Sequence, residues 1–193
     1  MALSKGKVPM SFVEKIKEVL LSPTAFFTAI KREQGIKEAL VYVSILSLVS
    51  IILNYAINPK VFSELAALGL PSSIGIGIIA LIWVLGILLN FLVVGFFHIF
   101  VMLLGGKEGY GATYRAFAYA ATPTNLFGWI PLIGILFSLW SLYLNVKGLS
   151  ILQHMSTGRA LAAIVIPIAI ILILIFTFAF AILAAILYGA ARQ

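Results

Sequence analysis

The sequence contains no cysteine and no aspartate among its 193 residues. Without cysteine, the chain has no disulfide, no thiolate nucleophile, no iron–sulfur cluster and no cysteine-bound zinc. Without aspartate, it is not an intramembrane aspartyl protease, because that mechanism uses two aspartates that share a proton. Charge is also scarce: Lys, Arg and Glu make up 10% of the residues, against about 25% in soluble domains. The composition therefore argues strongly against a water-soluble enzyme.

The chain is rich in apolar residues. They make up 63% of the sequence, and the mean hydropathy is +1.17, so lipid must serve as part of the solvent. The only histidines are His98 and His154, and neither a metalloprotease HExxH motif nor a hydrolase GxSxG motif is present. We therefore expect an integral membrane protein without catalytic activity, cofactor or bound metal.

Long apolar runs predict an all-α fold, a polytopic helical bundle with five transmembrane helices. About 20 apolar residues suffice for one crossing. The predicted spans cover residues 39–58, 74–104, 113–129, 132–152 and 159–188. The third and fourth would be joined by a tight turn at Gly128-Trp129-Ile130-Pro131. Residues 1–38 form a separate N-terminal segment, and residues 39–193 form the transmembrane domain.

The N-terminal segment predicts two short amphipathic helices. Ser11 and Glu14 have the spacing of a capping box that opens the first helix, and Ser22-Pro23 restarts the chain as the cap and first residue of the second. The expected apolar sides comprise Phe12, Val13, Ile16, Val19 and Leu20 in the first helix and Phe26, Phe27 and Ile30 in the second. Lys15, Lys17 and Glu18 are expected on the polar side. These helices either lie on the membrane surface or pack against the cytoplasmic end of the bundle.

The basic residues predict the orientation. Five spans with a cytoplasmic N-terminus place eleven of the thirteen Lys and Arg in the inner segments 1–38, 105–115 and 147–159, and only Lys60 and Arg192 outside. We therefore expect a cell-membrane protein whose C-terminus is outside. A re-entrant hairpin over 115–152 would keep both of its ends inside, so charge alone does not distinguish it from two crossings.

Polar side chains near the inner ends of the spans are the first candidate site. These are His98, Glu108, Tyr110, Tyr114, Arg115, Tyr119, His154 and Arg159. If they converge, they form a basic, hydrogen-bonding pocket suited to a lipid phosphate or an acidic partner. The alternative is that Arg115 and Arg159 extend to lipid headgroups while His98 bonds a neighbouring carbonyl.

Uncharged polar residues at mid-membrane depth are the second candidate site. The group comprises Asn90, Thr122, Pro123, Thr124 and Asn125. Such residues hydrogen-bond between helices, and a packing role is the stronger expectation; lining a path for lipid or a small solute is the alternative. Ala112, Ala116 and Ala120 repeat every fourth residue and predict a small-residue face for close helix contact.

The ordered set of short motifs resembles the Yip1 domain family, in its archaeal or bacterial branch. The motifs are Ser22-Pro23-Thr24-Ala25-Phe26-Phe27, Gly105-Gly106, residues 114–123, residues 128–134, Trp140, Gly148-Leu149 and residues 156–160. The resemblance implies five spans and a cytoplasmic N-terminus. Eukaryotic relatives are associated with Rab GTPases and vesicle traffic. This chain differs from them in lacking their long N-terminal region and in having Ala118-Tyr119-Ala120-Ala121 at the position of a YGYS-like motif.

Three functions follow as hypotheses. The first is a non-enzymatic Yip1-type protein that organises membrane lipid or partner proteins through its inner face. The second is a passive conduit for lipid or a small solute, lined by Asn90, Thr122, Thr124 and Asn125. The third is an enzyme acting on a lipid headgroup through His98, Glu108 and His154. The expected partners are anionic lipid headgroups, other proteins or a second copy of the chain, and not nucleic acid.

Overall fold

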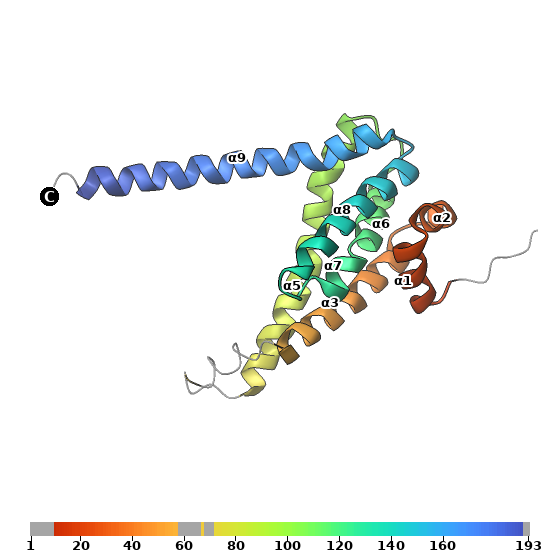
Figure 1. Ribbon diagram of the computed structural model, residues 1–193, viewed down its shortest axis with the longest axis horizontal. Coiled ribbons are helices and arrows are strands. Elements are labelled where there is room, and N and C mark those ends of the chain that lie inside the picture. Colours follow the sequence, from red (N-terminus) through yellow and green to blue (C-terminus); the bar gives the residue numbers. More distant parts are fainter. Residues whose placement is uncertain (1–9, 58–66, 68–71, 191–193) are drawn as a thin grey trace, which may run out of the picture.

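The computed structural model of the chain describes residues 10–57, 67 and 72–190. All regular structure in these residues is helical, which confirms the all-α prediction (Figure 1). The elements are α1 (Phe12–Leu21), α2 (Pro23–Ala29), the 3₁₀ helix η1 (Ile30–Arg32), α3 (Lys37–Ile57), α5 (Ser72–Leu103), α6 (Tyr110–Ala120), α7 (Thr122–Phe127), α8 (Ile133–Leu152) and α9 (Thr157–Ala190). Lys60 and Arg192, the predicted outer basic residues, lie outside the described part.

Four of the described helices are long and apolar enough to cross a membrane. They are Lys37–Ile57, Gly75–Leu103, Ile133–Leu152 and Thr157–Tyr188, and they agree with four of the five predicted spans. The remaining span, predicted at residues 113–129, is divided between α6 and α7, because Pro123 lacks the N–H that would continue one helix. The count of five crossings therefore stays a prediction.

A tight turn joins α7 to α8, as the sequence predicted. Gly128 ends α7, and a Cβ built on Gly134 would clash with the Gly128 carbonyl. Helices α6 and α7 both pack along α8, so the segment is a helical hairpin. Ala112, Ala116 and Ala120 are all buried, as expected for a small-residue face, and Ala116 lies against Gly148 of α8.

The two N-terminal helices pack on the bundle. Phe26, Phe27 and Ile30 are at most 1% exposed, and α2 lies against α8. The structure therefore favours the packing alternative over helices that place their phenylalanines in the membrane surface. Two predictions about α1 are wrong: Val13 is 62% exposed, and Lys15, expected on the polar side, is buried.

The last helix, α9, leaves the bundle (Figure 1). It packs against α5 and α8, and the ribbon shows this contact at its beginning, with the rest projecting away from the other helices. From Ile173 to Leu183 its large apolar side chains are at least half exposed. This surface is suited to lipid contact.

Candidate functional site

A capping box sets the residue at which α1 begins. Ser11 accepts the Glu14 N–H at 3.3 Å, and the Glu14 carboxylate accepts the Ser11 N–H at 2.7 Å. This confirms the helix start read from the sequence. Val19, one turn after Lys15, is fully buried, so the α1 face that packs on the bundle carries both an aliphatic side chain and a lysine.

Lys15 is the centre of a buried polar cluster. Its Nζ donates to Glu38 at 2.7 Å, to Glu33 at 3.1 Å and to the Tyr119 hydroxyl at 3.1 Å. The Tyr119 hydroxyl in turn donates to Glu33 at 2.9 Å. Burial lowers the pKa of the Lys15 ammonium, but its hydrogen bonds to Glu38 and Glu33 outweigh that effect and raise the pKa above the ordinary value. Lys15 therefore stays charged throughout the neutral range.

Aromatic rings enclose the cluster on the bundle side. The Tyr119 ring lies 5.0 Å from the rings of both Phe26 and Tyr42, and the Tyr42 and Thr122 hydroxyls are 2.8 Å apart. These contacts join α2, α3, α6 and α7. The cluster thereby connects the N-terminal helices to the hairpin.

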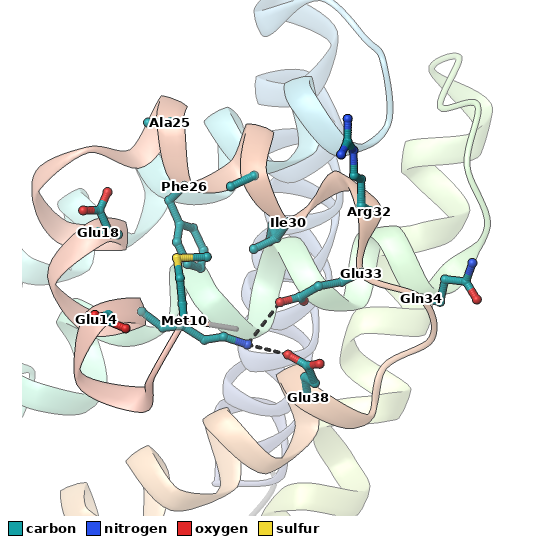
Figure 2. A pocket seen from close by; sticks show the side chains of 12 residues that line it. Met10, Glu14, Glu18, Ala25, Phe26, Ile30, Arg32, Glu33, Gln34 and Glu38 are labelled. Carbon is teal, nitrogen blue, oxygen red and sulfur yellow. Dashed lines mark hydrogen bonds and ion pairs between the residues drawn. The ribbon is translucent and has the colours of Figure 1, made fainter. Parts of the chain in front are cut away.

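A cavity of about 730 Å³ opens above this cluster, between α1, α2, η1 and the start of α3. Four of the six glutamates in the chain line it, and the cations that line it are Lys15 and Arg32. Figure 2 shows Glu14 and Glu18 on one side and Glu33 and Glu38 on the other, with Phe26 and Ile30 between them. Arg32 points away from the ion pairs, which the dashed lines mark. The cavity thus has an apolar floor and an acidic rim.

The inner-face candidates do not form one basic pocket among the described residues. Tyr119 belongs to the acidic cluster of Lys15, and Arg115 donates to the Gly35 carbonyl at 2.8 Å. His154 and Glu108 form an exposed pair at 3.7 Å. Arg159 is exposed at the start of α9. Their functional role stays a prediction.

His98 and Gln153 form a second polar cluster. His98 Nδ1 lies 2.8 Å from the Thr113 hydroxyl, and the fully buried Gln153 donates to the same hydroxyl at 2.9 Å. Gln153 also accepts the Glu108 N–H at 2.8 Å. Tyr110, whose ring lies against His98, donates to the Phe91 carbonyl at 3.0 Å. These bonds hold α5, α6 and the end of α8 together.

The mid-membrane candidates divide into two sets. Thr122 donates to the Tyr119 carbonyl at 2.6 Å, the acceptor that Pro123 leaves free, and Thr124 bonds Ser141 of α8 at 2.6 Å. Both threonine hydroxyls are therefore engaged in hydrogen bonds within the protein. Asn90 and Asn125 instead line a separate cavity of about 300 Å³ beside Tyr114.

Comparison with known families shows the family to which the chain belongs. The family model of the Yip1 domain matches residues 17–180. The chain belongs to the Yip1 domain family. Searches of curated proteins and of solved structures gave no significant match.

The region matched by the Yip1 domain model, residues 17–180, includes most of the residues that line the acidic cavity. The matched region begins within α1 and ends within α9, so Glu18, Glu33 and Glu38 lie inside it and Lys15 lies just before it.

The sequence analysis did not predict that Lys15, Glu33 and Glu38 form a group. One signal was available: Lys15 precedes Val19 by one helical turn, and residues at that spacing share a face.

Proposed function

We propose that this Yip1 domain protein is a non-enzymatic membrane protein that binds a partner protein at the acidic cavity of α1, α2 and η1. The supporting observation is the composition of that cavity: four carboxylates and two cations surround an apolar floor in a chain whose net charge is +7. Its sign is opposite to that of the rest of the molecule. A partner segment with basic and apolar side chains complements it.

The acidic rim favours a protein over an anionic lipid at this position. A phosphate headgroup would meet Glu14, Glu18, Glu33 and Glu38, and like charges brought together cost several kcal/mol. The exposed lysines of the same region, Lys17, Lys31 and Lys37, lie outside the cavity. They suit anionic headgroups, so in this proposal lipid binds around the cavity and protein binds in it.

The proposal includes the orientation. With the N-terminus in the cytoplasm of a cell-membrane protein, the cavity faces the cytoplasm, where soluble partners are available. Partner recruitment at this face is how the protein would organise its membrane. A catalytic role for His98, Glu108 and His154 has less support, because His98 is bonded to Thr113 whereas His154 and Glu108 pair at the surface.

Site-specific photo-crosslinking in cells tests the proposal. Ala25 lines the cavity and is exposed, so p-benzoylphenylalanine at this position should form an adduct with a discrete protein. Glu18→Lys reverses one rim charge without touching the Lys15 ion pairs. We expect it to reduce that adduct by about tenfold, since a like-charge contact weakens binding.

The matched control is Lys17→Glu, an exposed substitution on the same helix outside the cavity. It should leave the adduct unchanged. A protein adduct that survives Glu18→Lys would refute the proposal. So would adducts with lipid alone that disappear in Lys17→Glu, since they would assign the surface to anionic headgroups.

A further inference from the structure

Helices α3 and α5 enclose two neighbouring cavities that are separate from the acidic cavity. The first, of about 300 Å³, includes Asn90, Tyr114 and Asn125 in its lining, and the second, of about 590 Å³, is lined by aliphatic side chains together with Tyr55 and Trp83. Ile51 and Trp83 line both. The two cavities therefore adjoin, with amide and hydroxyl groups at one end and a mainly apolar lining at the other.

The polar end carries hydrogen-bonding atoms that the described residues do not satisfy. Tyr114 is fully buried, and neither its hydroxyl nor Asn90 Oδ1 has a hydrogen-bond partner in the described part of the chain. The Tyr114 ring is held in place by stacking on Phe91 at 5.0 Å. Trp83, by contrast, is engaged, since its indole N–H bonds Ser47 at 3.1 Å. Buried polar groups in proteins are normally satisfied, so this end is suited to a ligand.

The position of these atoms defines the ligand chemistry. Asn90 lies near the middle of α5, at a depth where charged groups are costly. The described residues that line either cavity include no charged side chain, so an ionic headgroup has no counter-charge there. A hydroxyl suits both unsatisfied atoms chemically, because it can donate to Asn90 Oδ1 and accept from the Tyr114 hydroxyl, and both residues line the same cavity.

We propose that the groove between α3 and α5 binds an uncharged long-chain lipid alcohol. Its hydroxyl occupies the first cavity, bonded to Tyr114 and Asn90. Its hydrocarbon chain passes Ile51 and Trp83 into the second cavity, against Ile52, Ile76 and Ile79. Many apolar side chains of α5 are exposed and suit lipid contact, so in this proposal the ligand enters laterally from the bilayer. This site is independent of the acidic cavity.

Photo-labelling of the full chain in phosphatidylcholine nanodiscs tests this site. The probe is octadecanol with a diazirine in its chain, and mass spectrometry locates the labelled residues. We expect labelling around Ile51 and Trp83 that excess octadecanol suppresses and that equal octadecane or stearate does not. Equal suppression by octadecane would overturn the proposal, because the polar end would then contribute nothing.

Tyr114→Phe removes the hydroxyl and keeps the ring. We expect about fivefold weaker labelling, the effect of one hydrogen bond, with no loss of thermal stability, because that hydroxyl has no partner in the described protein. Unchanged labelling would contradict the assignment.

Two glycines of α5 provide a matched pair. A Cβ at Gly86 or at Gly77 meets nothing within 4 Å, but only Gly86 lines the first cavity. Gly86→Leu should abolish specific labelling by filling the cavity, and Gly77→Leu should preserve it. Equal labelling of the two variants would place the probe elsewhere.

Discussion

Lys15 is a cation at 8% exposure, and its charge has to be compensated locally. Removing one partner of such a cluster costs more stability than the ion pairs contribute to folding, because the remaining buried charge is left without a partner. Glu33 is the vulnerable partner, since its side chain is 16% exposed, whereas that of Glu38 is 64% exposed and can be hydrated. The cluster therefore ties the position of α1 to residues 33–38 and to α6.

Replacing Lys15 with methionine should detach α1 from the bundle. The substitution leaves Glu33 and the Tyr119 hydroxyl without their cation, and we expect a loss of roughly 2–3 kcal/mol in the free energy of unfolding. Thermal unfolding in detergent and limited trypsin cleavage after Lys17 measure the two effects. Lys17→Arg, an exposed change on the same helix that keeps the trypsin site, should alter neither stability nor the release of α1. A Lys15→Met protein as stable and as protease-resistant as the wild type would show that the cluster does not hold α1.

At the residue scale, the sequence predicted correctly those features that depend on residues close together in the chain. The Ser11–Glu14 capping box and the buried Phe26, Phe27 and Ile30 stripe follow from spacings within a few residues. Lys15 pairs with acids 18 and 23 residues later, and the bonds of Gln153 to Thr113 and the Glu108 N–H span 40 and 45 residues. No periodicity encodes such partners, so the buried clusters became visible only in the fold.

At the scale of elements, α8 is the helix on which the others assemble. Gly148 makes this possible: a Cβ there would lie 2.9 Å from the Phe27 ring and 3.1 Å from the Ala116 Cβ. Helices α2 and α6 therefore both approach the α8 backbone at one point. Small residues allow such contact in membrane bundles because packing, and not hydrophobic exclusion, drives helix association.

Gly148→Leu should separate these three helices. Inserting a larger side chain into a packed site typically costs about 1–3 kcal/mol, and Phe27 is the group that must move. Thermal unfolding should show the loss, and a fluorophore on α2 should show increased mobility. Gly77→Leu, placed where no atom lies within 4 Å of the new Cβ, is the control. Equal stabilities of the two variants would contradict the packing argument.

At the scale of the molecule, the number of crossings decides the sides on which the termini lie. Cysteine labelling can determine this number. Because the sequence has no cysteine, each introduced cysteine carries the only thiol that can react. Five crossings predict that Lys17→Cys and Gln193→Cys react with an impermeant maleimide from opposite sides. They also predict that Leu132→Cys, at a position 84% exposed in the turn before α8, reacts from the same side as Gln193→Cys.

The other topologies give different patterns. If only the four long helices cross, Lys17→Cys and Gln193→Cys react from the same side. If residues 115–152 are re-entrant, the termini react from opposite sides but Leu132→Cys does not react from the outer side.

Of the five spans predicted from the sequence, four are continuous helices in the structure, because length and hydropathy determine these. It did not predict the division at Pro123 into α6 and α7 or the projection of α9, which depend on contacts between helices.

The bond between Lys15 and Tyr119 joins residues 104 positions apart. During translation at about 5–20 residues per second, α1 and α2 leave the ribosome roughly 5 to 20 seconds before the hairpin that covers them. For that interval Phe26 and Phe27 have no bundle to pack on, and the nearest apolar environment is the bilayer surface. We therefore expect the amphipathic helices to rest on the membrane as a biosynthetic intermediate and to move onto the protein once α6 and α8 have been inserted.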